Sequence, residues 1–381
     1  MKKILNLESL SIGLAMFSMF FGAGNVIFPL ALGQFAGDLS FYAILGLIIT
    51  AIIMPFLGVF SMILFNGSHQ EFFGRLGKIP GFLLALIIIA LLGPLGSTPR
   101  CIALTYSTLK SVFPSIQPVL FCGFSCLVVY LLSFRKSRIL SILGWVLTPF
   151  LLASLIAIVC IGLWKTGDIH SIDNNGMGVF WHGLKEGYNT MDLLAAFFFS
   201  SAILTLLKER KTIYSPIKLS LHASFIGAIL LTLVYIGFCV LAAFHGSNLI
   251  GINKDQLLSS IALKIAGPSA GILVCIAIAL TCLTTAVALI SVFSDFIQKQ
   301  VFKEKVRYET VLLGALLLTF AISTMQFTGI AAFLTPILDI TYPGLIIFTL
   351  LNILHKLTGF KPLKWPVFLT FGVSTLLWLL K

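Results

Sequence analysis

An apolar segment from about Leu10 to Leu32 is long enough to cross a lipid bilayer, yet small and polar residues interrupt its middle. The interruption reads Phe21-Gly-Ala-Gly-Asn-Val-Ile-Phe-Pro29. Glycine costs about 1 kcal/mol relative to alanine inside a helix, and asparagine is costly in hydrocarbon without a hydrogen-bonding partner. Because lipid cannot satisfy backbone polar groups, the interruption predicts either close packing against another helix or a polar site at mid-membrane.

The composition indicates that this segment belongs to a protein that crosses the membrane many times. Of 381 residues, 59% are hydrophobic and 10% are charged, whereas ordinary globular chains are about 25% charged. The net charge of +12 comes from short basic clusters between apolar segments, a distribution that does not indicate a nucleic-acid partner. The seven cysteines form no CxxC pair, so neither a zinc site nor a disulfide framework is predicted.

The apolar residues fall into eleven segments, each about long enough to span a bilayer. We therefore expect an all-α polytopic membrane protein without a separate soluble domain. A polar loop is expected over 165–185, and Gly93-Pro94 and Pro99-Arg100 are expected to interrupt the third segment. The segments are 9–33, 41–65, 81–109, 119–134, 140–164, 187–207, 217–244, 267–293, 311–325, 332–354 and 363–380.

Lysine and arginine are distributed unequally between the two sides of this expected bundle. If the amino terminus is cytoplasmic, eighteen of them fall in cytoplasmic loops and six on the other side, while Arg100 lies inside a segment. Positive charge gathers in the cytoplasmic loops of membrane proteins. The sequence thus predicts a multi-pass protein with a cytoplasmic amino terminus.

A second polar interruption, Glu186-Gly-Tyr-Asn-Thr-Met-Asp192, opens the sixth segment, five segments after the first interruption. Because five is odd, a second set of five segments would be inverted relative to the first. Paired interruptions in two such halves indicate a transport site. We predict one transporter domain over 1–381, with repeats at about 9–165 and 186–355 and an extra segment at about 362–380.

The first interruption offers the groups that a zwitterionic amino acid needs. The N-terminus of a half-helix presents free N–H groups and about half a positive charge, which suits a carboxylate. Unwound carbonyl groups suit an ammonium group or Na⁺. Gly22 and Gly24 would let a ligand approach the backbone, and the Asn25 side chain would bridge ligand or ion.

Polar residues in other segments allow more than one interpretation. Thr281, Thr284 and Thr285 offer oxygen ligands for a hard cation, but threonines in membrane helices also bond to their own helix carbonyls. Arg100 could pair with a carbonyl or carboxylate inside the bundle, or extend to the surface. Asp192 could take up a proton, bind a cation or cap the start of a helix, and the cap is favoured.

Four ordered motifs of this chain resemble the bacterial branched-chain amino acid:cation symporter family. They are Phe21–Pro29 with Leu32-Gly33-Gln34, Gly93-Pro94 with Pro99-Arg100, Gly187–Asp192, and Cys282–Val287. The family belongs to the amino acid/polyamine/cation superfamily, whose fold is the five-plus-five inverted repeat of LeuT. The resemblance implies Na⁺-coupled uptake of leucine, isoleucine and valine across the bacterial inner membrane, with no enzymatic activity and no cofactor.

More distantly, the segments Gly22–Asn25 and Thr281–Thr285 are similar to those that line the sodium sites of neurotransmitter:sodium symporters, and this resemblance implies binding residues. The Na⁺ ligands would be carbonyl groups of Ser18, Phe21 and Thr281 and hydroxyl groups of Thr284 and Thr285. The substrate would lie among Gly22, Ala23, Gly24, Asn25, Tyr188 and Thr190, with Arg100 and Asp192 in gating or structural roles. Members of the branched-chain symporter family usually have twelve segments, whereas this chain has eleven. The chain therefore departs from the family pattern in its last segments, in the side of the membrane on which its carboxyl end lies and in any dimer contact that those segments make.

Alternatives remain open at this point. A symporter of the same fold could carry another neutral or aromatic amino acid, or use H⁺ in place of Na⁺. A membrane enzyme or assembly factor would need a cluster of His, Asp or Cys at one membrane face, and the sequence shows none. A passive channel would lack saturation by substrate.

The charge asymmetry predicts the location of two reporter fusions. A reporter placed after Lys381 should lie outside the cytoplasm, and one in the loop Lys208–Lys218 should lie inside, because eleven crossings separate the chain ends. Alkaline phosphatase and green fluorescent protein fusions measure this difference. Equal signals from the two positions would contradict the segment count.

Overall fold

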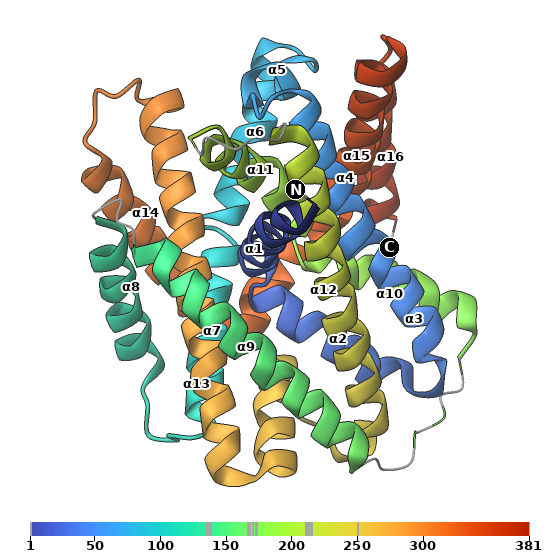
Figure 1. The fold of residues 1–381 in the computed structure, drawn as a ribbon, viewed down its shortest axis with the longest axis vertical. Coiled ribbons are helices and arrows are strands. Elements are labelled where there is room, and N and C mark those ends of the chain that lie inside the picture. The colour runs from blue at the N-terminus through green and yellow to red at the C-terminus, as the bar shows by residue number, and fades with distance from the viewer. Residues whose placement is uncertain are drawn as a thin grey trace.

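The computed structural model of the protein describes residues 2–134, 139–165, 169, 171, 174–209, 216–249 and 251–380. Every regular element among these residues is helical, which confirms the all-α prediction (Figure 1). The basic stretches 135–138 and 210–215, which carry part of the predicted charge asymmetry, lie outside the described residues.

The helices are α1 (Lys2–Phe20), α2 (Ala23–Ala36), α3 (Ser40–Ile48), α4 (Met54–Leu64), α5 (His69–Gly74), α6 (Lys78–Leu92), α7 (Ser97–Lys110), α8 (Pro118–Phe134), α9 (Ile139–Trp164), α10 (Gly176–Asn189), α11 (Asp192–Glu209), α12 (Pro216–Phe244), α13 (Leu257–Phe296), α14 (Tyr308–Ser323), α15 (Gln326–Thr358) and α16 (Lys364–Leu379). Short 3-10 or π-helical turns stand between some of them, namely η1 (Gly37–Leu39), η2 (Ile49–Ile53), η3 (Gly246–Leu249), η4 (Lys254–Gln256) and η5 (Ile297–Val301).

Most apolar segments of the sequence become long helices. In the described part of the chain, five helical stretches are long and apolar enough to cross a membrane, and shorter apolar helices such as α8 accompany them. The five are Ala23–Leu64, Lys78–Lys110, Ile217–Phe244, Gly271–Val301 and Gln326–Thr358. The outer surface of the bundle exposes large apolar side chains, for example Leu120 of α8 and Leu369 of α16, each 70% exposed. An apolar exterior of this extent fits contact with lipid tails.

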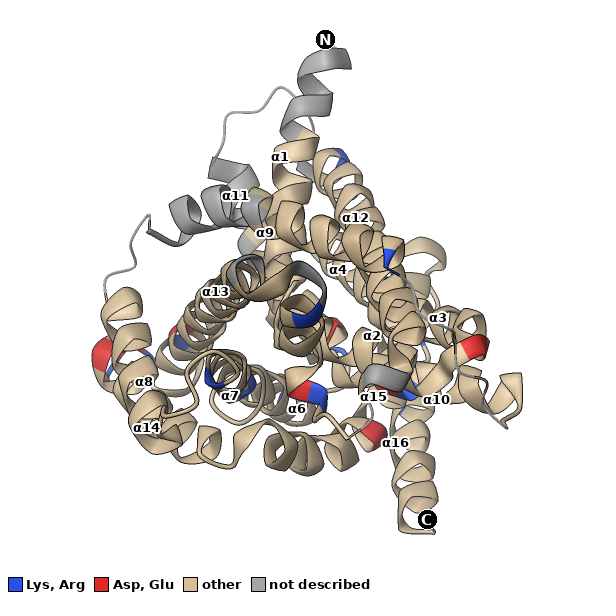
Figure 2. Ribbon diagram, turned by 90° about the horizontal axis from the view of Figure 1, so that it is seen from below, with Lys and Arg blue, Asp and Glu red and all other residues tan. Residues whose placement is uncertain are grey.

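The first predicted interruption is a break between two helices. α1 ends at Phe20 and α2 begins at Ala23, so Phe21 and Gly22 stand between them. Figure 1 shows α1 end-on, near the centre of the view, whereas most other helices run up the picture. In Figure 2 the same helix leads away from the centre of the bundle next to α12. The chain therefore changes direction at the break.

The second predicted interruption is also a break, but its first helix begins earlier than expected. α10 ends at Asn189 and α11 begins at Asp192, with Met191 at a φ of 64° between them. Because α10 begins at Gly176, the part of the expected polar loop 165–185 that follows this residue is helical, and that expectation was wrong. The reason is tertiary packing, since Gly183 of α10 lies directly against the backbone of Ala43 in α3.

The third segment is broken once, at Gly93-Pro94, between α6 and α7. Pro99 and Arg100 were expected to form a second interruption, but they lie inside the first turn of α7. Proline is compatible with a first helical turn, where backbone N–H groups have no intrahelical partner. The break therefore places Arg100 at the start of a helix inside the bundle.

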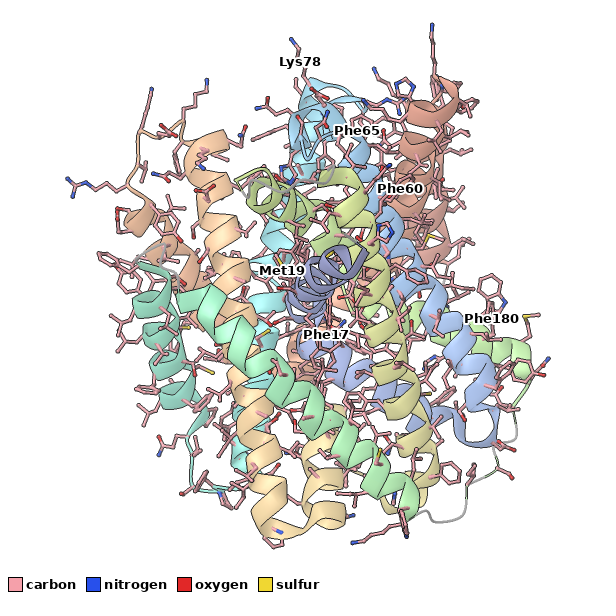
Figure 3. All side chains as sticks on the ribbon, in the orientation of Figure 1. Phe17, Met19, Phe60, Phe65, Lys78 and Phe180 are labelled. Atoms are coloured by element: carbon pink, nitrogen blue, oxygen red, sulfur yellow. The ribbon has the colours of Figure 1, made fainter. Side chains whose placement is uncertain are left out.

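Aromatic and aliphatic side chains fill the bundle, and few charged residues lie among the helices (Figure 2). Near α5, the rings of Phe72, Phe73 and Phe348 pack within 5.7 Å of one another. Figure 3 shows Phe65 and Lys78 at this same end of the molecule, and Phe17 and Met19 on α1 near its middle. Polar groups at the centre are therefore exceptions that need an explanation.

Candidate functional site

The two breaks lie against each other inside the bundle. A β-carbon added to Gly24 would come within 3.1 Å of the backbone carbonyl oxygen of Thr190, so α2 touches the chain where α10 ends. A residue with a side chain would push one of these two backbones away. The breaks in the first and sixth segments thus form one structural unit.

A cavity lies beside this contact. Its volume is about 30 Å³, which is room for a water molecule and well below the roughly 300–1,000 Å³ of small-molecule sites, so the cavity is nearly closed in this conformation. Its apolar wall contains Met19, Phe20, Leu92, Ala195, Phe199 and Leu289. Its polar wall contains Gly22, Gly24, Asn25, Ser97, Arg100, Thr190, Asp192 and Thr285. The cavity therefore combines an apolar wall with a few polar groups from four segments.

Asn25 connects the first break to two other segments. Its Oδ1 accepts a hydrogen bond from the Gly22 backbone N–H at 2.9 Å, which satisfies one N–H group at the start of α2. Its Nδ2 donates to Oδ2 of Asp192 at 2.7 Å and also to the hydroxyl of Tyr235. All three side chains are at most 2% exposed. Asn25 is therefore fully engaged by protein groups, whereas the sequence suggested that it would bridge a ligand.

Asp192 lies at the start of α11, and its carboxylate connects that helix to α2 and α12. Oδ2 accepts hydrogen bonds from Asn25 and, at 3.0 Å, from the Tyr235 hydroxyl. The sequence interpretation favoured a helix cap and did not foresee these bonds between helices. Because the residue also lines the cavity, it presents an acidic group to whatever enters.

Arg100 is buried, with 2% of its surface exposed, so the alternative that it extends to the membrane surface is wrong. Its Nη1 donates to the backbone carbonyl oxygen of Asn189 at 2.7 Å, where α10 ends. The guanidinium carbon lies 5.3 Å from the ring centre of Phe28 and 5.7 Å from that of Phe327, distances typical of cation–π contact. Arg100 thus supplies a donor to the second break.

The three candidate threonines of α13 differ in the partner of their hydroxyl group. Thr281 and Thr284 donate to carbonyl oxygens of their own helix, at 2.9 and 2.8 Å, as the structural alternative predicted. Thr285 instead directs its hydroxyl at the Phe21 carbonyl oxygen, 3.4 Å away in the first break. The structure therefore brings Thr285 and Phe21 together, with Ser18 one turn earlier in α1.

Most of the residues expected to bind substrate line the cavity, but one does not. Gly22, Ala23, Gly24, Asn25 and Thr190 line the cavity. Tyr188 lies outside this lining and stacks on Tyr342 at 4.7 Å between ring centres. Thr190 donates its hydroxyl to the Gly187 carbonyl oxygen at 2.9 Å.

Sequence reasoning missed two groups of residues. Tyr235 and Ser97 both reach the breaks, and only their polarity within an apolar segment could have indicated them. A second group lies along α10, where Glu186 pairs with Lys254 at 3.0 Å and accepts from Asn189 at 3.2 Å. This group joins the end of α10 to the turn η4.

Comparison with known proteins gives consistent results. A sequence profile described as "Branched-chain amino acid transport protein" matches residues 6–380. A branched-chain amino acid permease of Corynebacterium glutamicum, BrnQ, is 30% identical over 364 residues, which cover 95% of this chain and 83% of the permease.

Two solved structures share the fold at low sequence identity. The inward-facing conformation of Mhp1 superposes with a TM-score of 0.64 at 12% identity, covering 97% of this chain and 88% of that one. A substrate-bound, outward-open, Na⁺-coupled sialic acid symporter gives 0.62 at 11% identity, with the same coverages. The LeuT-like fold expected from the sequence is confirmed.

The close approach of the two breaks predicts the effect of a single methyl group. Gly24→Ala places a β-carbon 3.1 Å from the Thr190 backbone and should destabilise the protein by about 1–3 kcal/mol. The measurement is thermal unfolding of the purified protein in detergent. Gly314→Ala is the matched control, because a β-carbon at that helical position meets no atom within 4 Å. Equal melting temperatures for the two variants would contradict the packing described here.

Proposed function

Because the chain belongs to the family of branched-chain amino acid transport proteins, we propose that it takes up leucine, isoleucine and valine by Na⁺ symport. The observation that carries this proposal is the polar cavity between two broken helices at the centre of an apolar bundle. Discontinuous helices that meet at such a site are typical of secondary transporters. The protein would act in a bacterial inner membrane, with its amino terminus in the cytoplasm.

The lining of the cavity, once the breaks move apart enough to admit a ligand, suits a neutral amino acid with an aliphatic side chain. Leu92, Phe199 and Leu289 offer that side chain an apolar wall. The first turn of α2, at Ala23 and Gly24, would attract the carboxylate, because backbone N–H groups and the helix dipole favour negative charge. Tyr188 would not touch the substrate directly, since it is not among the residues that line the cavity.

The coupling ion would bind where Thr285 meets Phe21. The carbonyl oxygens of Ser18, Phe21 and Thr281 and the hydroxyls of Thr284 and Thr285 are the five ligands of this proposal. Oxygen ligands of this kind suit Na⁺. The proposal is supported by the 3.4 Å approach of the Thr285 hydroxyl to the Phe21 carbonyl oxygen across two segments.

This arrangement would couple ion and substrate through one break. The ion would hold Phe21 against α13 while the substrate contacts Gly22–Asn25, so both would favour the same conformation of the break. A cation that moves down 100 mV releases about 2.3 kcal/mol. That free energy supports roughly fifty-fold accumulation of a neutral amino acid.

H⁺ coupling is the second candidate, and Asp192 is the observation in its favour. A buried carboxylate that lines the cavity and is bonded to Asn25 and Tyr235 offers a place for a proton. Protonation there would change the hydrogen bonds that connect α11 to α2 and α12.

Uptake of labelled leucine into proteoliposomes tests the proposed function. An inward Na⁺ gradient should drive accumulation, and an inward H⁺ gradient without Na⁺ should not, because the ion ligands proposed here are oxygens suited to a metal cation. Isoleucine and valine should compete with leucine, and valine should be the weaker, since one methylene changes affinity by about 1–3 kcal/mol. Lysine and glutamate should not compete. If phenylalanine competes more strongly than isoleucine and valine, the substrate is an aromatic amino acid. If an H⁺ gradient alone drives accumulation, the coupling ion is H⁺.

Substitution of the α13 threonines tests the ion site. Thr285→Ala should raise the Na⁺ concentration that gives half-maximal uptake several-fold, because it removes a ligand that reaches the break. Leucine affinity at saturating Na⁺ should change less. Thr232→Ala is the matched control, since that hydroxyl bonds within its own helix α12, to the Ala228 carbonyl oxygen at 2.7 Å. Unchanged Na⁺ dependence in the Thr284→Ala, Thr285→Ala double variant would remove these residues from the site.

A further inference from the structure

We propose that Arg100 binds the α-carboxylate of the transported amino acid. This assignment rests on the proposed function, because it adds a residue to the same substrate site. It goes beyond the binding surface offered by the α2 backbone, since it places a full positive charge in the cavity wall.

The first observation is an incompletely paired guanidinium. Arg100 is 2% exposed, and its Nη1 donates to the Asn189 carbonyl oxygen at 2.7 Å. Nε and Nη2 are buried without a hydrogen-bonding partner among the described residues. A buried charged group is costly unless an opposite charge and hydrogen bonds compensate it. The rings of Phe28 and Phe327 contribute cation–π attraction, but they accept no hydrogen bond in place of an anion.

Nearby acidic groups already have other partners. Glu186, one turn before Asn189, pairs with Lys254 at 3.0 Å. Asp192 accepts from Asn25 and Tyr235. Within the described part of the chain, neither carboxylate forms an ion pair with Arg100. The missing anion is therefore best supplied from outside the protein.

The second observation is the place of Arg100 in the cavity. Arg100 lines the same cavity as Gly22, Ala23 and Gly24, and α7 packs on α2. The Gly22 N–H is already bonded to Asn25. A carboxylate at the remaining N–H groups of α2 would also meet the guanidinium, whose planar donors match two carboxylate oxygens.

The third observation concerns the other pole of the ligand. Asp192 lines the cavity from α11, so the wall carries one basic and one acidic residue. A zwitterion with its carboxylate toward Arg100 and its ammonium group toward Asp192 satisfies both. An analogue that lacks the carboxylate leaves the guanidinium without its anion.

Binding of three ligands to the purified full-length protein in saturating Na⁺ tests the proposal. The ligands are leucine, leucinamide, which lacks the carboxylate charge, and 4-methylpentanoate, which lacks the ammonium group. Arg100→Gln should weaken leucine binding roughly ten- to a hundred-fold, the effect of a lost hydrogen bond to a charged group. Leucinamide should bind equally well or better, because two positive charges no longer meet. 4-Methylpentanoate should lose affinity about as much as leucine, so the preference for leucine over 4-methylpentanoate should stay the same, since both carboxylates lose their partner.

Controls separate this role from a structural one. Arg75→Gln is the matched substitution, because the Arg75 guanidinium bonds to Asn352 at 2.8 Å and to the Lys361 carbonyl oxygen, away from the cavity. It should leave the ratio of leucine to leucinamide affinity unchanged. If Arg100→Gln lowers the affinity for leucine and for leucinamide equally, the proposal is overturned, and Arg100 has only a structural role at the second break.

Two further outcomes distinguish a failure of the Arg100 proposal from a failure of the variant to fold and from a failure of the proposed function. If Arg100→Gln does not fold, Arg100→Lys replaces it, because lysine keeps the charge but not the planar pair of donors. If Arg100→Lys then weakens the binding of leucine and not that of leucinamide, the proposal is supported. If it weakens the binding of both ligands equally, the proposal is overturned. If the unmodified protein binds none of leucine, isoleucine and valine, the proposed function itself fails, whatever Arg100 does.

Discussion

Backbone groups exposed by a break in a membrane helix must find partners inside the protein, because lipid offers none. In this bundle each partner comes from a different element. The Gly22 N–H bonds to Asn25, and the Phe21 carbonyl oxygen faces Thr285 of α13. In the second break, the Asn189 carbonyl oxygen accepts from Arg100 of α7, and the Leu193 N–H donates to Tyr342 of α15. The need to satisfy two breaks therefore determines which helices surround the centre.

The same bonds give the site its chemistry. A group that bonds to exposed backbone is polar, so satisfying the breaks places Asn25 and Arg100 in a wall that would otherwise be apolar, and Asn25 in turn bonds to Asp192. This is the physical reason that interrupted helices and transport sites occur together.

Contact between the breaks also explains how separate ligands could act on one another. Gly24 of the first break touches Thr190 of the second, so movement of α2 must involve the end of α10. Near the end of α10, Glu186 forms an ion pair with Lys254 of η4, which is far away in the sequence. An ion or an amino acid that changes one break would thus change contacts across the whole site.

The sequence by itself determined the class of protein, the all-helical architecture, the places of both breaks and the family. These follow from local properties, namely apolar length, glycine in an apolar run and ordered motifs. Only the tertiary structure decided that residues from Gly176 on extend α10, that Arg100 is buried, and that Asn25, Asp192 and Tyr235 are bonded together. The partner of a polar side chain in a membrane bundle is set by helix packing between segments hundreds of residues apart, as Thr285 and Phe21 show. Local sequence carries no record of that packing.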